Sequence, residues 1–278
     1  MTHSRPVIHE LLDRHGLSAR REFGQNFVAD PNTVRKLAHL SGVGPGDLVV
    51  EIGPGLGSLT LALIETGARV VAVEVDPGLA TAAAEVVGDR ARVIEADALT
   101  LDWSELLDVE AESTAMPVHV VANLPYNIGT TLVLDILAEV ERVTSLSVLV
   151  QTEVAERFAA DVGTKAYGIP TVLAGLHADA HIVATVPASV FVPRPKVQSS
   201  FVQLCRRPEA PPVEHDLLAR VVKAGFGQRR KMLRRSLAPL LSEDEIASAG
   251  VQPTDRAEQV DLDGWVRLAT AHGQRGRA

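Results

Sequence analysis

The sequence predicts an α/β fold: a Rossmann-like parallel sheet followed by a small helical domain. Short runs rich in Val and Ile alternate with helical patterns through the first 150 residues. This alternation is typical of a parallel sheet covered on both faces. Beyond residue 207 the pattern is helical only. Ligands of such sheets bind beyond the carboxyl ends of the strands, so the strand ends are where we expect chemistry.

Five strands and three helices form the predicted sheet. The strands are residues 47–52, 69–75, 92–95, 118–122 and 145–150, and the helices are residues 59–65, 79–87 and 128–140. A helical piece at 151–160 and a polar loop at 161–168 follow. Two more strands, at 181–186 and 197–206, are expected to join the sheet antiparallel.

A cluster of prolines, Pro208, Pro211 and Pro212, reads as a linker. Beyond it, helical patterns occupy residues 215–226, 229–241, 243–249 and 263–272. We therefore expect a catalytic domain at residues 1–207 and a helical domain at residues 208–278.

Composition limits the class of protein. The chain has 278 residues, 46% of them hydrophobic, as in a globular protein. Its only cysteine, Cys205, excludes intrachain disulfides and thiolate metal clusters, and the nine histidines lack metal-ligand spacing. No apolar run reaches the roughly 18 residues of a membrane span, and the first 16 residues are too polar for a signal peptide. We expect a cytoplasmic protein without a metal or a membrane span.

A glycine-rich turn, Glu51-Ile52-Gly53-Pro54-Gly55-Leu56-Gly57, closes the first strand. Glycines there let a ligand approach the backbone at the strand end. The spacing is G-x-G-x-G, whereas a nicotinamide dinucleotide fingerprint places its third glycine one position later. Taken alone, the turn is equally compatible with a tight β-to-α connection that binds nothing.

Two acids end the next two strands. Glu74 lies 21 residues beyond Gly53, where a carboxylate can accept both hydroxyls of a ribose. Asp97 ends the third strand, where it can accept from the exocyclic amine of adenine. Either acid alone could be a solvated strand-end carboxylate. Together with the glycine turn they indicate an adenosine site without a phosphate grip, and S-adenosylmethionine is the ligand that fits.

The fourth strand runs into Asn123-Leu124-Pro125-Tyr126. An aromatic amine is a poor nucleophile because its lone pair is delocalised, and two hydrogen-bond acceptors can pull its nitrogen toward tetrahedral geometry. The Asn123 side-chain oxygen and the Leu124 carbonyl are suitable acceptors, Pro125 stiffens the turn, and Tyr126 can stack on a base. The alternative is a surface turn with an incidental tyrosine.

These motifs together resemble the ribosomal RNA adenine N6-dimethyltransferases. Residues 21–28 are similar to the family's N-terminal motif, whose matching positions here, Gln25, Asn26 and Val28, line the methionine end of the cofactor; Val28 stands where Leu is usual. Residues 191–197 are similar to a later motif whose aromatic, here Phe191, faces the tyrosine across the extruded base. The resemblance runs from about residue 14 to residue 268.

The resemblance implies a class I S-adenosylmethionine-dependent methyltransferase. It implies direct in-line transfer, without a metal or a covalent enzyme intermediate, and we expect a monomer. Residues 225–237 are similar to the basic helix of the small-subunit branch. That branch dimethylates two adjacent adenosines in the 3′-terminal hairpin of 16S rRNA during assembly of the small ribosomal subunit.

A basic stretch predicts where RNA binds. The net charge of the chain is −8, but residues 194–235 hold eleven basic and three acidic residues, a balance of +8, against −16 elsewhere. A solvated charged helix face is the alternative. The candidate RNA-binding residues are Arg194, Lys196, Lys223, Arg229, Arg230, Lys231, Arg234 and Arg235. Arg20 and Arg21 form a second basic spot.

Three other functions stay open. One is methylation of large-subunit rRNA, as in the macrolide-resistance branch of the family. Another is a ribosome-assembly factor in which methyl transfer is secondary. A nicotinamide oxidoreductase is the remote option, since the glycine spacing and the Asn-Leu-Pro-Tyr turn do not suit hydride transfer.

Overall fold

The computed structural model describes residues 2–19, 25–111 and 113–275, and it divides the chain into two compact units. Unit 1 comprises Met1–Ala155 and His181–Cys205, and unit 2 comprises Glu156–Ala180 and Arg206–Ala278. The chain enters unit 2 for the last time after Cys205, two residues before the domain boundary expected after residue 207. Residues 156–180, expected in the sheet domain, belong to unit 2.

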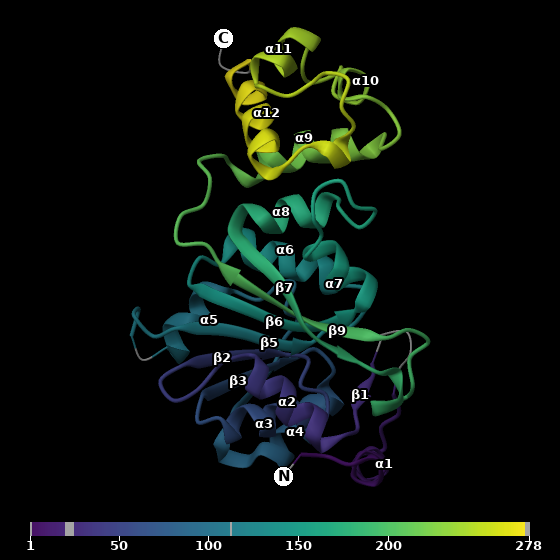
Figure 1. The fold of residues 1–278 in the computed structure, drawn as a ribbon. Helices are drawn as coiled ribbons and strands as arrows, with labels where there is room; N and C mark the ends of the chain where they lie inside the picture. Colours follow the sequence, from purple (N-terminus) through teal and green to yellow (C-terminus); the bar gives the residue numbers. More distant parts are fainter. Residues whose placement is uncertain (1, 20–24, 112, 276–278) are drawn as a thin grey trace. The chain divides into compact units, whose positions relative to one another are not determined.

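A seven-stranded sheet organises unit 1 (Figure 1). Its order is β4(Arg92–Glu95), β3(Arg69–Glu74), β2(Leu48–Ile52), β5(Val118–Asn123), β6(Val143–Gln151), β9(Ser199–Arg206), β7(Ala178–Val186). The first five strands pair in parallel and β9 runs antiparallel to β6, so the α/β fold and this antiparallel addition are confirmed. The five predicted parallel strands are all present.

Seven α-helices lie within the described residues up to position 158. They are α1(Arg5–Arg14), α2(Pro31–Leu40), α3(Ser58–Glu65), α4(Pro77–Val87), α5(Trp103–Glu110), α6(Gly129–Glu139) and α7(Thr152–Phe158). Figure 1 shows α2, α3 and α4 on one face of the sheet and α6 on the other. Helices α1, α2 and α5 were not among the predicted elements. The N-caps Asp30 and Asp102, whose side chains accept from Thr33 N and Glu105 N, were the available signals for α2 and α5.

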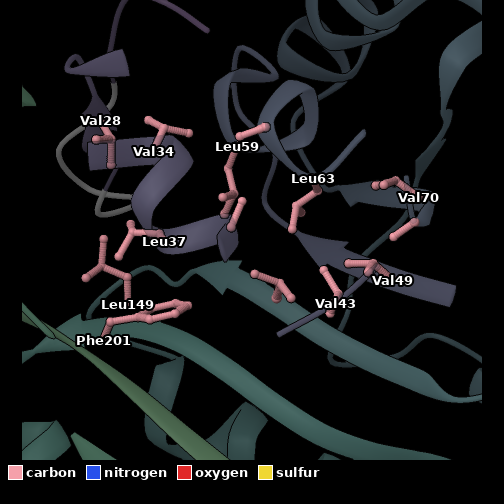
Figure 2. Packing of buried hydrophobic residues seen from close by; sticks show 14 of the residues in the cluster. Val28, Val34, Leu37, Val43, Val49, Leu59, Leu63, Val70, Leu149 and Phe201 are labelled. Carbon is pink, nitrogen blue, oxygen red and sulfur yellow. The ribbon is translucent and has the colours of Figure 1, made fainter. Parts of the chain in front are cut away.

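One apolar layer joins α2 and α3 to the sheet. Val34 and Leu37 of α2 and Leu59 and Leu63 of α3 belong to one buried cluster with side chains of the sheet. Figure 2 shows these helix residues facing Val49, Val70, Leu149 and Phe201. Burial of this layer fixes the helices that follow the strands, and with them the turns at the carboxyl edge.

A two-stranded ribbon links two motifs that are far apart in the sequence. β1(Phe27–Val28) pairs antiparallel with β8(Phe191–Val192), with Val28 opposite Phe191. The N-terminal motif and the motif at 191–197 are therefore neighbours in space.

Unit 2 is helical apart from the start of β7. Its helices are α8(Ile169–His177), α9(His215–Gly227), α10(Leu233–Ser236), α11(Glu243–Ser248) and α12(Leu262–Arg275). Three 3-10 helices, Gly88–Arg90, Ala188–Val190 and Ala257–Gln259, complete the regular structure of the described chain.

The prediction of a helix at 229–241 is wrong, and residues 225–237 do not form one continuous basic helix. Only Leu233–Ser236 is α-helical, and Lys231 N donates to Gln228 O in a turn. The backbone amides of Leu233 and Arg234 donate to Asp255 O and Pro253 O. These bonds to a distant segment replace the bonds to preceding carbonyls that would have continued a helix.

Aromatic packing explains the start of the same segment. The ring of Phe226 stacks on that of Trp265, with centroids 5.6 Å apart, and Trp265 is fully buried. A Cβ at Gly225 would lie 2.4 Å from the Trp265 ring. Gly225 and Phe226 therefore serve the core of unit 2, and the charged character of the segment begins after them.

No described helix is both long and apolar enough to cross a membrane. No group of three or more His, Cys, Asp or Glu side chains in the described ranges could hold a metal ion. Cys205 is exposed, although its place in an apolar strand would favour a buried thiol.

Candidate active site

A cavity lies at the carboxyl edge of the sheet in unit 1. Parallel pairing sets Ile52 opposite Val73 and Ala122, so the residues that follow, Gly53, Glu74 and Asn123, emerge side by side. The predicted residues that line the cavity are Gln25, Asn26, Val28, Gly53, Gly55, Glu74, Asn123, Leu124, Pro125 and Tyr126. The sheet register thus brings together most of the predicted site. Residues 21–24 of the N-terminal motif, and Arg20, lie outside the described residues.

The glycine turn needs its glycines for conformation and for one close contact. Gly53, Gly55 and Gly57 have φ of 69°, 57° and 78°, in the left-handed region. A Cβ at Gly55 would lie 2.8 Å from Cε1 of Phe27, which itself lines the cavity. The turn is therefore shaped against the protein's own N-terminal strand as well as toward a ligand.

Glu74 is held as an acceptor by the backbone. Its Oε2 accepts from Gly55 N at 3.0 Å and its Oε1 from Asp76 N at 3.1 Å. Burial raises the pKa of Glu74, and these amides act in the opposite direction. Each carboxyl oxygen keeps a further lone pair, so both can still accept from ribose hydroxyls.

Glu51, the first residue of the glycine-rich turn, lines the cavity, although no role was predicted for it. It is almost fully buried, at 1% exposure, and its Oε2 has no hydrogen-bond partner among the described residues. Burial raises its pKa to about 8, and nearby Glu74 adds to the shift. A buried carboxyl oxygen without a partner is costly unless a ligand supplies a donor or a positive charge. S-adenosylmethionine, which carries an ammonium and a sulfonium, fits this residue set.

Asn123 is oriented by a backbone carbonyl. Its Nδ2 donates to Asn26 O at 2.8 Å, which ties the end of β5 to the N-terminal motif. The amide nitrogen is thereby engaged, and the oxygen Oδ1 is the atom that can accept from a substrate amine. Leu124 N donates to Leu149 O at 3.1 Å, which fixes the next peptide against β6.

Tyr126, the last residue of the Asn-Leu-Pro-Tyr turn, lines the cavity. Its side chain is partly buried, and its hydroxyl lies 3.0 Å from Oγ of Ser199, at the start of β9. Burial raises the pKa of the phenol, so it stays protonated at neutral pH.

Two predicted site residues are not brought to the cavity. Asp97 is exposed, and its Oδ1 accepts from Leu99 N, so it lies at the edge of the sheet without lining the cavity. Phe191 is fully buried in the apolar layer with Leu37 and Phe201, because its pairing with Val28 turns it into the core. The expected clamp of Tyr126 and Phe191 is absent from this structure.

The N-terminal segment contributes groups that sequence reasoning missed. Ile8 of α1 lines the cavity. The His3 ring donates from Nε2 to Leu56 O at 2.8 Å, inside the glycine turn, and Arg5 donates to Ser189 O at 2.9 Å. No motif marks these contacts, since each joins a side chain to a distant backbone carbonyl.

The predicted RNA-binding residues divide between the units. Arg194 and Lys196 are exposed on the loop between β8 and β9 in unit 1, and the others belong to unit 2. Arg229 is engaged in structure: its guanidinium donates to Thr164 O and Lys165 O and lies over the Phe226 ring. Arg234 pairs with Glu243 at 3.4 Å. The remaining four, Lys223, Arg230, Lys231 and Arg235, are exposed with no acidic partner in the described chain.

Comparisons with known proteins identify the family that this chain resembles. Residues 16–272 match the family model described as ribosomal RNA adenine dimethylase. The ribosomal RNA small subunit methyltransferase A of Phenylobacterium zucineum is 46% identical over 269 residues, covering 96% of this chain and 92% of that protein. The protein of the same name from Cutibacterium acnes is 42% identical, covering 97% and 94%.

Solved structures show the same fold. The 23S rRNA methyltransferase ErmE aligns with a TM-score of 0.68 at 26% identity, covering 89% of this chain and all of that one. A dimethyladenosine transferase from Plasmodium falciparum aligns with a TM-score of 0.74 at 21% identity, which supports the fold alone. With the family model matched over nearly its whole length, the chain belongs to the ribosomal RNA adenine dimethylase family of S-adenosylmethionine-dependent methyltransferases.

Proposed function

We propose that this protein dimethylates N6 of two adjacent adenosines in the 3′-terminal hairpin of small-subunit (16S) rRNA, using S-adenosylmethionine. The proposal for the small subunit rests on the names of relatives that are 42–46% identical over nearly the whole chain. The proposal for the amine rests on one observation: Asn123 donates to Asn26 O and so presents its oxygen at the edge of an adenosine site.

The adenine amine needs two acceptors. Oδ1 of Asn123 accepts one N–H and the Leu124 carbonyl accepts the other, which draws the nitrogen lone pair out of conjugation. When bound, S-adenosylmethionine supplies an electrophilic methyl group on its sulfonium. Glu74 holds the ribose of the cofactor, and the positive charge of the bound cofactor would favour the ionised form of the Glu51 carboxyl, which burial otherwise keeps protonated.

The same acceptors suit a second transfer. After the first methylation the nitrogen has one N–H left, and an acceptor that loses a donor is only left unoccupied, whereas a donor would clash with the new methyl. A neutral amide at position 123 also avoids a charged group beside the growing apolar substituent.

Tyr126 provides one aromatic face for the flipped adenine. Aromatic stacking of this kind contributes about 1–3 kcal/mol per base. Phe191 supports β1 and β8 from the core rather than contacting the base. Lys223, Arg230, Lys231 and Arg235 of unit 2, together with Arg194 and Lys196 of unit 1, bind RNA phosphates.

We further propose that the protein acts in the cytoplasm, as a monomer, on immature small subunits. The support for a monomer is that a single chain supplies every group of the proposed site. The support for the immature subunit is again the family branch.

The decisive experiment incubates the protein with labelled S-adenosylmethionine and, in parallel, small and large subunits that lack adenine methylation. We expect label in two adjacent adenosines near the 3′ end of small-subunit rRNA, recovered as N6,N6-dimethyladenosine. Label confined to large-subunit rRNA would favour the other branch of the family. No label with either particle would contradict both.

A further inference from the structure

The hydroxyl of Tyr126 is anchored by a residue that belongs to none of the motifs described above. Ser199 is the first residue of β9, and its Oγ lies 3.0 Å from the Tyr126 hydroxyl. Ser199 is fully buried, and its backbone is in register with Gln151 at the end of β6. The strand pairing therefore fixes the backbone of Ser199, and its hydroxyl lies within hydrogen-bond distance of Tyr126.

The neighbouring residue shows that this contact is specific. Ser200 is also fully buried, and its hydroxyl also pairs with another hydroxyl at 3.0 Å, that of Thr152. Successive side chains of a strand point to opposite faces, so the two serines serve different partners. Ser199 reaches the residue proposed to stack on the substrate, whereas Ser200 reaches the first residue of α7.

A tyrosine ring has two rotatable bonds, and one hydrogen bond at its far end restricts both. Tyr126 follows a proline turn and is only partly buried, so packing alone does not enclose the ring. Without an anchor, the ring would have to be ordered each time a base stacks on it, and that entropy would be lost on binding.

We propose that Ser199 is a positioning residue for the target base: its hydroxyl holds the Tyr126 ring in the orientation that receives the flipped adenine. The proposal rests on the proposed function, since it takes Tyr126 as the stacking residue. Ser199 itself touches neither the substrate nor the cofactor. Its effect reaches the base only through the tyrosine.

The test compares Ser199→Ala with Ser200→Ala, which removes an equally buried hydroxyl from the adjacent position. For Ser199→Ala we expect kcat/KM for unmethylated small subunits to fall about fivefold to tenfold, with unchanged affinity for S-adenosylmethionine. Ser200→Ala should match it in melting temperature and retain kcat/KM within about twofold. Equal activity losses in the two variants would overturn the proposal.

A double-mutant cycle asks whether the serine acts through the tyrosine. Tyr126→Phe removes the other half of the same hydrogen bond, so the double variant Ser199→Ala/Tyr126→Phe should be no worse than either single variant. Ser199→Thr, which keeps a hydroxyl, should restore most of the activity. Multiplying losses in the double variant would place the effect of Ser199 elsewhere and overturn the proposal.

A measurement without substrate separates this inference from the proposed function. The chain has two tyrosines, and the hydroxyl of Tyr167 donates to Val260 O instead. With ring-labelled tyrosine, Ser199→Ala should shift and broaden the NMR signals of Tyr126 and leave those of Tyr167 unchanged. Unchanged Tyr126 signals would refute the anchoring, whereas shifted signals in a protein that methylates neither subunit would refute only the proposed function.

Discussion

The polar groups of unit 1 and unit 2 are arranged for different tasks. In unit 1, Glu74 and Asn123 are tied to backbone groups, which fixes them for a small ligand. In unit 2, Lys223, Arg230 and Lys231 project into solvent. Fixed groups in a sheltered cavity recognise shape and stabilise a reaction, whereas mobile surface charges bind a polyanion with little regard to detail. We therefore expect mutations in unit 1 to lower the rate of methyl transfer and mutations in unit 2 to weaken the salt-dependent affinity for RNA.

The largest effect is expected in unit 1, from Asn123→Ala. Removing one positioned polar group from a reaction centre costs about 100-fold to 1000-fold in rate, and we expect a loss of this size in single-turnover methyl transfer. Affinity for S-adenosylmethionine, measured by calorimetry, should change less than about tenfold, because Glu74 and the glycine turn remain. Asn32→Ala, at an exposed position of α2, is the control. Near-normal transfer by Asn123→Ala would remove the basis for the proposed mechanism.

Unit 2 is tested by removing two adjacent charges. Arg230→Gln/Lys231→Gln should weaken RNA binding about tenfold near physiological salt and reduce the slope of log K against log salt by roughly 1.4 to 1.8. The control, Arg35→Gln/Lys36→Gln, also removes two adjacent positive charges, from α2 in unit 1. The salt dependence is read from filter binding at several ionic strengths. If both pairs weaken binding equally, net charge rather than a local surface governs the affinity.

Dependence of stability on pH should have opposite signs in the two units. Glu51 in unit 1 has its pKa raised to about 8 by burial, so the folded state keeps a proton that the unfolded chain, with a value near 4.5, releases. Its contribution to stability is present below pH 4.5 and is lost as pH rises toward 8. Burial lowers the pKa of His177 in unit 2 to about 4, against 6.5 unfolded, with smaller effects from His215 and Arg206. Its contribution is lost as pH falls from 6.5 toward 4.

Two variants separate these slopes. Glu51→Gln should flatten the decline of melting temperature between pH 5 and 8, and His177→Gln should flatten the decline below pH 6.5. Thermal melts in buffers from pH 4 to 8 provide the measurement. A wild-type slope retained in either variant would mean that its carboxyl or imidazole does not titrate as described.

The smallest expected effect distinguishes two adjacent arginines. Arg229 donates to Thr164 O and Lys165 O, so Arg229→Gln should lower the free energy of unfolding by about 1–2 kcal/mol. Arg230 is exposed, and Arg230→Gln should cost less than about 0.5 kcal/mol. Urea titrations compare the two. A destabilisation by Arg230→Gln as large as that by Arg229→Gln would contradict the distinction between an arginine that supports the fold and one that binds RNA.

The sequence by itself determined the parallel sheet and the residues at its strand ends. Alternating strand and helix patterns report which local face is buried, and the candidate groups Gly53, Glu74 and Asn123 each lie at the end of a strand or directly after it. Once parallel pairing is assumed, their proximity follows from the geometry of a sheet. Of the helices that were missed, α2 and α5 were marked by aspartate N-caps, whereas α1 has no side-chain cap. The helix wrongly expected at 229–241 does not form, because the backbone there bonds to residues 253 and 255 instead.

Only the tertiary structure decided which partner each side chain finds. Ser199 meets Tyr126, His3 meets Leu56 O, and Arg229 meets Thr164 O across separations that no local pattern records. The pairing of β1 with β8 turns Phe191 into the core, although its motif suggested a base contact. The physical reason is that periodicity encodes burial along one segment, whereas a contact between segments depends on the register and packing of both.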